Sequence, residues 1–209
     1  MLDWVHTHAP QGRVVLASSA AVYGNAHTTP IPESARPQPY YPYGFHKRMG
    51  ELCCQAYAQS YGLNTSIVRF FSVFGAELRK QLLWDLCHRF RHRPESIELW
   101  GSGDEVRDWI HIGDAVRYLQ RAADMASETC PVINGGSGRG TPVSAIAAFV
   151  RDAWNPRTEL RFNHKSRPGD PFYLVADAGF AKSLGINAQA DLESEIHRYV
   201  AWFQERTSE

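Results

Sequence analysis

Short apolar runs separated by helical segments are the sequence feature that most limits the folds open to this chain. Residues 13–17 (RVVLA) and 64–71 (NTSIVRFF) are rich in β-branched and apolar residues. Both runs have the length and composition of strands buried on the two faces of a parallel sheet. A helical pattern over 43–61, ended by Gly62, connects them. Strands that alternate with helices in this way indicate an α/β fold with a largely parallel sheet.

The same alternation continues to the end of the chain. The Pro-rich stretch 25–42 is expected to be a loop, and in the helix after it Met49, Leu52, Ala56 and Tyr57 recur on one face. Residues 1–10 are expected to form the end of a helix. Further helices are predicted at 79–93, 114–126, 142–154, 177–184 and 190–205, and strands at about 97–100, 107–112, 132–133 and 160–162.

Composition restricts the possible partners. Lys+Arg and Asp+Glu balance at 22 each, so no overall field favours nucleic acid or an anionic membrane, and an anionic ligand needs a local group of cations. The four cysteines have no metal-ligand spacing, and we expect buried thiols, no metal site and a reducing compartment. The start MLDWVHTHAP lacks the features of a signal peptide, and no apolar run reaches the ~18 residues that span a bilayer. The cytoplasm is the expected location.

Tyr43 and Lys47 are the first candidates for chemistry. They lie four residues apart at the start of a predicted helix, so both side chains point to the same side. A phenol is a weak base at neutral pH, and an adjacent ammonium stabilises its phenolate. Taken alone, the pair is equally compatible with an exposed pair on a helix surface.

A hydroxyl group placed before this helix makes the pair more specific. The segment Ser18-Ser19-Ala20-Ala21-Val22-Tyr23-Gly24 ends the first predicted strand, and the active sites of parallel sheets lie at that edge. A serine there can hold a substrate alcohol or carbonyl while Tyr43 moves the proton. Together, S-S-A-A-V-Y-G, the Pro-rich loop and P-Y-G-F-H-K closely resemble the extended short-chain dehydrogenase/reductase family, whose typical members are nucleotide-sugar epimerases such as UDP-galactose 4-epimerase.

The resemblance implies both a fold and a catalytic set. The chain is expected to form the C-terminal part of a Rossmann-type doubly wound parallel sheet with a small α/β substrate-binding lobe. Its implied divisions are 1–76 and 113–141 for the partial NAD-binding domain, and 77–112 and 142–209 for the substrate lobe. Ser19 is the implied catalytic hydroxyl, Tyr43 the acid/base, and Lys47 the residue that both tunes Tyr43 and binds the nicotinamide ribose of NAD.

Three further segments resemble family motifs. Val68 to Gly75 (VRFFSVFG) matches a strand that ends near nicotinamide and sugar, so Phe71 is expected to contact the cofactor and Ser72 the substrate, at a position where many members have Asn. Gly101 to Asp114 contains Arg107, and Arg167-Pro168-Gly169-Asp170 contains Arg167. In the family these two arginines grip the diphosphate of the nucleotide sugar, a task that suits guanidinium groups.

Each of these residues also has a plainer interpretation. Arg107 has Asp108 and Asp114 within reach of a salt bridge, and Arg167 has the sequence context of an exposed loop cation. Trp100 is expected either to stack on the nucleotide base or, as the more common role of a tryptophan, to pack in the core.

The glycine-rich dinucleotide loop of such a fold has no match in this sequence. No G-x-G-x-x-G or G-x-x-G-x-x-G occurs, and the nearest cluster, Gly135 to Gly140, has neither that spacing nor a following acidic residue. We interpret the cluster as a flexible strand-to-helix turn rather than as a phosphate loop. The resemblance therefore lacks the roughly 90–100 residues that carry the first four strands of the family, and tight NAD binding by these 209 residues is not expected.

Several functions remain open at this stage. The family-level expectation is epimerisation of a nucleotide-diphospho-sugar, with C4 as the favoured position, since Ala20-Ala21 stand where dehydratases carry an Asp-Glu pair. A related reductase or decarboxylase needs the same triad. The chain is expected to be an inactive piece of a longer enzyme, an enzyme whose NAD site another chain completes, or a non-catalytic nucleotide-sugar-binding or scaffold protein. A homodimer through the helix Tyr43–Tyr61 is expected from the family.

Overall fold

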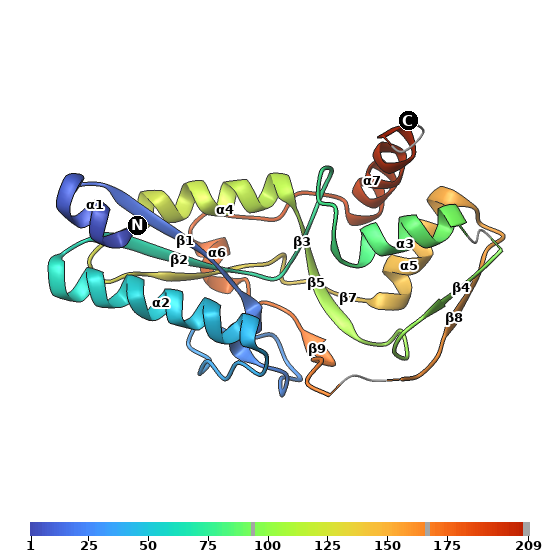
Figure 1. Cartoon of the computed structure of the whole chain (residues 1–209), viewed down its shortest axis with the longest axis horizontal. Helices are drawn as coiled ribbons and strands as arrows, with labels where there is room; N and C mark the ends of the chain where they lie inside the picture. Colours follow the sequence, from blue (N-terminus) through green and yellow to red (C-terminus); the bar gives the residue numbers. More distant parts are fainter. Residues whose placement is uncertain (93–94, 166–167, 207–209) are drawn as a thin grey trace.

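A parallel three-stranded sheet forms the first half of the structure, a computed structural model that describes residues 1–92, 95–165 and 168–206. The strands are β1 (Arg13–Ser19), β2 (Asn64–Phe70) and β6 (Val132–Gly135), in the order β1-β2-β6. Helices α2 (Pro42–Tyr61) and α4 (Ile112–Met125) cover its two opposite faces (Figure 1). This is the layered parallel arrangement that the alternating pattern predicts.

A second sheet is built around β5 (Val106–His111). It pairs in parallel with β3 (Ser72–Phe74) and β9 (Tyr173–Leu174) and antiparallel with β7 (Gly140–Pro142). A separate parallel ribbon joins β4 (Ser96–Leu99) and β8 (Glu159–Phe162). The fold is therefore α/β and mostly parallel, with β7 as the antiparallel strand of the described sheets.

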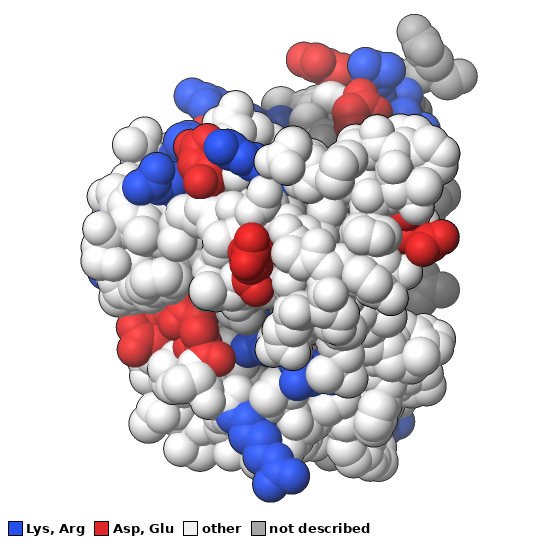
Figure 2. Space-filling model, turned by 90° about the vertical axis from the view of Figure 1, so that its left-hand side faces the viewer, with Lys and Arg blue, Asp and Glu red and all other residues white. Residues whose placement is uncertain are grey.

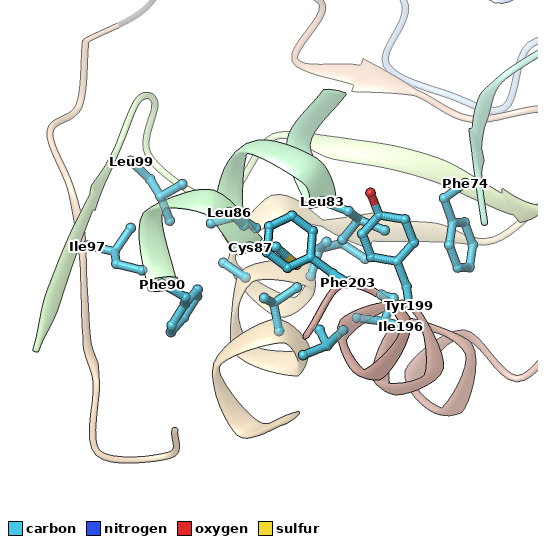
Figure 3. Close-up of a cluster of buried hydrophobic side chains, with 14 of the residues drawn as sticks. Phe74, Leu83, Leu86, Cys87, Phe90, Ile97, Leu99, Ile196, Tyr199 and Phe203 are labelled. Carbon is cyan, nitrogen blue, oxygen red and sulfur yellow. The ribbon is translucent and has the colours of Figure 1, made fainter. Parts of the chain in front are cut away.

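The largest core cluster lies between α3 (Gln81–His92), α5 (Val143–Trp154) and α7 (Leu192–Arg206), beside the second sheet (Figure 3). Apolar residues at helical spacing fill it, as amphipathic helices require. Leu86, Phe90, Ile146 and Phe203 are fully buried there. The short elements α1 (Leu2–His8), η1 (Ala20–Tyr23) and α6 (Gly179–Ser183) complete the chain. None of the helices in the described residues is long and apolar enough to cross a membrane.

The sequence pattern predicts a single strand over residues 64–71, and this prediction is wrong at its end. β2 ends at Phe70, and β3 begins at Ser72 in the other sheet, where Ser72 pairs with Trp109. Phe71 between them donates its backbone N–H to the carbonyl of Gly135. Continuous apolar sequence hides this change of sheet. The strands β7 and β9 are also absent from the prediction, since two or three residues show no period.

The predicted apolar stripe of α2 is not its buried face. Met49 and Leu52 are exposed, and the buried residues are Gly44, Glu51, Cys54 and Ala58. The buried face of α2 contains the charged residue Glu51, so a search for apolar residues at helical spacing does not identify it. The expectation of four buried thiols is wrong for the same helix, because Cys53 is exposed. Burial raises the pKa of Cys54 to about 11 and that of Cys87 to about 12.

Glu51 belongs to a buried polar network that ties α2 to the first sheet. Its carboxylate is fully buried and accepts two hydrogen bonds of 2.9 Å from the Arg69 guanidinium and one of 2.7 Å from Ser18 Oγ. Arg48 donates to the same carboxylate at 2.9 Å. Arg69 also donates to the Tyr23 hydroxyl at 3.0 Å. Burial raises the pKa of Glu51, but the hydrogen bonds from Arg69, Ser18 and Arg48 outweigh it and lower that pKa below its ordinary value.

The surface at the α1 end shows no concentration of one charge. Most of this face is formed by residues other than Lys, Arg, Asp and Glu, and the charged side chains stand in small groups of both signs (Figure 2). The predicted division at residues 76, 112 and 141 stays a prediction.

We predict that Glu51→Gln destabilises the protein by about 3–5 kcal/mol, because it leaves the buried Arg69 without its counter-charge. Since the folded pKa of Glu51 is depressed, the stabilisation that it gives is present above the unfolded pKa and is lost as pH falls through the folded pKa. Urea unfolding at several pH values measures both effects. The exposed Glu159, paired with Arg161, supplies the control variant Glu159→Gln, which is expected to leave stability unchanged. Equal effects of the two substitutions contradict the prediction.

Candidate active site

Ser19 lies at the carboxyl end of β1, the edge of the sheet that the sequence predicts. Its Oγ accepts a hydrogen bond of 3.2 Å from the backbone N–H of Ala21 and so caps the short helix η1. The side chain is partly buried. A hydroxyl held in this way has a fixed position and still has its own proton to donate.

Tyr43 and Lys47 lie on one side of the first turns of α2, as predicted from their spacing. The Lys47 Nζ lies 5.7 Å from the centroid of the Tyr43 ring, and it donates a hydrogen bond of 2.8 Å to the carbonyl of Ala17 on β1. Tyr43 is 57% exposed, so its hydroxyl is open to a ligand. The lysine is thereby oriented by the strand that also carries Ser19.

A close approach of two backbones brings the turn after Ser19 to the turn that holds Tyr43. A Cβ at Gly44 would lie 2.6 Å from the carbonyl oxygen of Ala21, a distance that side-chain carbons do not adopt. The start of α2 therefore packs directly on η1, and glycine permits this contact. The three residues of the predicted triad share this region, although their catalytic roles stay a prediction.

A hollow of about 390 Å³ brings Arg107 and Trp100 together. We call it the Arg107 hollow. Trp100 is 50% exposed on its wall, so the alternative of a core tryptophan is wrong. The other lining residues are Leu82, Asp85, Arg89, Leu99, Gly101, Glu105, Val143, Lys165, Asp170 and Phe172.

The two salt bridges considered for Arg107 do not form among the described residues. Its guanidinium donates instead to the carbonyls of Val106 at 3.0 Å and Phe172 at 3.4 Å. Burial lowers the pKa of Arg107, while the nearby Asp170 and Glu105 raise it. Guanidinium groups nevertheless stay protonated in proteins, so a fixed cation faces the hollow.

Asp108 points to the opposite side of the sheet, where it fills the glycine cluster 135–140. Its carboxylate accepts hydrogen bonds from Ser137 N at 2.7 Å, Ser137 Oγ at 2.6 Å and Gly138 N at 2.9 Å, and a fourth from Ala176 N at 3.1 Å. Backbone N–H groups that could hold a phosphate are thus occupied by an internal anion. These hydrogen bonds support the interpretation of the cluster as a structural turn rather than as a phosphate loop.

Arg167 lies outside the described residues, but the loop that follows it is described. The Tyr41 hydroxyl donates to the carbonyl of Pro168, and a Cβ at Gly169 would clash with the Tyr40 ring. Asp170, the next residue, lines the Arg107 hollow. The loop 168–170 therefore joins the start of α2 to the hollow, and Gly169 with φ +89° adopts a conformation that favours glycine.

Phe71 and Ser72 lie at the break between the two sheets. Phe71 is mostly buried, with its ring centroid 6.4 Å from that of Tyr23, and Ser72 is partly buried at the start of β3. Their contacts with cofactor and substrate stay predictions. Within the described residues no group of three or more His, Cys, Asp or Glu side chains is arranged to hold a metal ion.

Sequence reasoning missed the residues that position this site. Glu51 follows Lys47 by four residues, so it lies on the same face of the helix as Tyr43 and Lys47. This spacing is the sequence signal that could have identified Glu51. The contacts of Tyr40, Tyr41 and Asp108 join segments far apart in the sequence. Local pattern gives no signal for such contacts.

Comparison with known proteins shows the family of the chain. The model of the NAD dependent epimerase/dehydratase family matches residues 1–134. The chain belongs to this family. It is 28% identical over 196 residues to a putative UDP-glucose 4-epimerase from Methanocaldococcus jannaschii, covering 92% of this chain and 63% of that protein.

Two solved structures extend the likeness to three dimensions. MoeE5 in complex with UDP-glucuronic acid and NAD has a TM-score of 0.85 and 29% identity, over 98% of this chain and 69% of its own. TunA, a hexosamine 5,6-dehydratase that depends on NAD, has a TM-score of 0.86 and 28% identity, over 98% and 67%. NAD is thus the cofactor of the family. The chain spans between 57% and 63% of the length of the first three curated relatives.

We predict that Gly169→Ala lowers the melting temperature by several degrees and increases hydrogen exchange at residues 168–172. A methyl group there meets the Tyr40 ring in addition to the strain of a left-handed backbone, which is worth about 1–3 kcal/mol. Gly185→Ala is the matched control, because Gly185 has φ +77° and a Cβ there would have no atom of the described residues within 4 Å. If the two variants melt at the same temperature, the contact of the loop with Tyr40 contributes nothing.

Proposed function

We propose that this chain carries the substrate-binding and proton-transfer parts of an enzyme that epimerises a nucleotide-diphospho-sugar at C4 with NAD. The observation that carries the proposal is the loop 168–170, which joins the Tyr43 end of α2 to the Arg107 hollow. A sugar held at Tyr43 then has space for its diphosphate and nucleotide in the hollow.

Each residue of the site has a distinct task in this reaction. The Tyr43 phenolate, stabilised by the Lys47 ammonium, takes the proton of the sugar hydroxyl and later returns it. Ser19 donates a hydrogen bond to the same sugar oxygen. Arg107 holds the diphosphate as a fixed cation. Bound NAD supplies the hydride acceptor and donor of the reaction.

The described residues fit one end of NAD. Lys47 has three N–H donors and uses one of them on Ala17, so it retains donors for the ribose hydroxyls next to nicotinamide. The loop 136–138 is filled by Asp108, and we propose that the pyrophosphate of NAD does not bind to this loop.

Epimerisation is preferred to dehydration because of the residues after Ser19. Elimination of water needs an additional acid and base, and Ala20 and Ala21 supply neither. The similarity to both epimerases and a dehydratase is compatible with either reaction, so this difference in side chains supports the choice. Reduction or decarboxylation with the same triad is an alternative outcome of product analysis.

A homodimer through α2 and a cytoplasmic location are also proposals. Phe45, Met49 and Leu52 are exposed on α2, and a second copy of the helix would cover them. Sedimentation at increasing concentration measures this association, and a purely monomeric chain refutes it.

We predict that Arg107→Ala weakens the binding of UDP by about 1.5–3 kcal/mol, or roughly 10- to 150-fold, because it removes a charge-assisted contact. Isothermal titration calorimetry measures the change. Arg161→Ala, which removes an exposed arginine of β8 outside the hollow, is the control and is expected to bind UDP as the parent chain does. Unchanged affinity in the Arg107 variant refutes the assignment.

We further predict that the 209-residue chain binds NAD weakly and does not interconvert UDP-glucose and UDP-galactose by itself. Tyr43 and Lys47 reach only the nicotinamide ribose, whereas most of the cofactor affinity in such folds comes from a glycine turn and a helix N-terminus. Quenching of tryptophan fluorescence during an NAD titration tests this. Saturable micromolar binding by the monomer contradicts the prediction. UDP-sugar binding without NAD binding or turnover is expected both of an incomplete enzyme and of a non-catalytic binding protein.

A further inference from the structure

Asp108 lies where the second sheet meets the first. It is fully buried on β5, next to Arg107 in the sequence. Its Oδ1 accepts hydrogen bonds from the backbone N–H and the hydroxyl of Ser137, and its Oδ2 accepts from the backbone N–H groups of Gly138 and Ala176. Ser137 and Gly138 follow β6 of the first sheet, and Ala176 follows β9 of the second. One carboxylate therefore joins the strand of Arg107 to two other segments.

The segment that follows β6 is connected to the turn that Ser19 caps. Asn134 on β6 accepts at Oδ1 a hydrogen bond of 2.7 Å from the Tyr23 hydroxyl. Tyr23 is the last residue of η1, the short helix whose N-cap is Ser19. The side-chain amide of Asn134 also donates to the carbonyl of Ile31 at 2.8 Å. Hydrogen bonds of Asn134 therefore hold the strand before the loop 136–138 against η1.

The segment around Ala176 reaches the same turn. Ile31 donates its backbone N–H to the carbonyl of Val175 and accepts from the N–H of Asp177, both at 2.9 Å. Ile31 and Ala176 are buried in one apolar cluster with Tyr23 of η1. The two segments that the buried carboxylate binds are therefore both connected to η1.

The two ends of the proposed ligand depend on this connection. Under the proposed function, on which this inference rests, Arg107 holds the diphosphate and Ser19 donates a hydrogen bond to a sugar oxygen. The two residues belong to different sheets, since Arg107 lies on β5 and Ser19 on β1. The distance between them therefore depends on contacts between the sheets. A ligand makes both contacts at once only where that distance matches the separation of its diphosphate and its sugar.

We propose that Asp108 is a positioning residue, which sets the distance between the diphosphate contact at Arg107 and the sugar contact at Ser19. It does not touch the ligand, because its carboxylate is fully buried and both oxygens accept hydrogen bonds from the protein. Asp108→Asn keeps the size of the side chain, but an NH₂ group replaces one oxygen and cannot accept. In either orientation of the amide, at least one backbone hydrogen bond between the segments is lost.

A double-mutant cycle with Ser19→Ala tests this role, with UDP-glucose and UDP as the ligands in calorimetry. In the parent chain, Ser19→Ala is expected to weaken UDP-glucose binding by about 2- to 12-fold and to leave UDP binding unchanged, because only the sugar reaches the serine. In the Asp108→Asn background this loss is expected to fall below about 1.5-fold, since the serine no longer meets the sugar oxygen. Each loss is a ratio within one background, so a general effect of Asp108→Asn on binding cancels.

Asp114→Asn is the matched control for the cycle. Asp114 is also a buried carboxylate, and it accepts hydrogen bonds from the backbone N–H groups of Gln189 at 3.2 Å and Ala190 at 3.3 Å. These partners lead into α7 rather than to η1. The control variant loses the same kind of hydrogen bond, and it is expected to keep the full loss that Ser19→Ala causes in the parent chain.

The outcomes separate this inference from the proposed function. A loss in the Asp108→Asn background as large as that in the parent chain, or an equal reduction in Asp114→Asn, overturns the positioning role, and the contacts of Arg107 and Ser19 then stand without it. If Ser19→Ala changes nothing in the parent chain, or if that chain binds neither ligand, the proposed function fails and the inference fails with it.

A milder variant keeps the test decisive if Asp108→Asn does not fold. Ser137→Ala removes only the hydroxyl hydrogen bond of 2.6 Å to Asp108 and leaves the backbone hydrogen bonds in place. The loss caused by Ser19→Ala is then expected to decrease in the same direction but by less. An undiminished loss in this background overturns the positioning role as well.

Discussion

The buried ion pair between Glu51 and Arg69 is the interaction on which the geometry of the site depends. Removing two charges from water is expensive, and a pair of this kind is tolerated when its geometry is good and its remaining donors and acceptors are satisfied. Here Arg69 binds both carboxylate oxygens, while Ser18 and Arg48 supply further hydrogen bonds. These hydrogen bonds can all form in only one arrangement of α2 against β1 and β2, so the network fixes that arrangement.

Because α2 is a continuous helix, fixing it at Glu51 also fixes the position of its start, where Tyr43 and Lys47 lie. Glu51 lies about 12 Å along the helix axis from Tyr43, since each residue advances a helix by about 1.5 Å. Ser18, which donates to Glu51, precedes Ser19 on β1. The same ion pair thus fixes both the strand that carries the serine hydroxyl and the helix that carries the tyrosine. Lys47, bonded to Ala17 on that strand, adds a second connection nearer to the site.

The sequence predicts the fold class and the Tyr43–Lys47 pair because both depend on local period and spacing. The sequence does not predict features that depend on contacts between segments far apart in the chain. Continuous apolar sequence conceals the break at Phe71, and the charge of Glu51 conceals the buried face of α2. The filling of the glycine cluster by Asp108 depends on a residue 29 positions before Ser137 in the chain. No local pattern contains that information.

The alternation of side chains along β5 determines which charge faces the Arg107 hollow. Successive side chains of a strand point to opposite faces, so the sheet separates Arg107 in the hollow from Asp108 in the glycine turn. A slip of β5 by one residue against β3 and β7 would exchange the two. The nucleotide side would then present an anion to the phosphates, and the turn would receive a cation against its backbone N–H groups. Pairing register, a property of the backbone alone, thereby determines which charge a ligand meets.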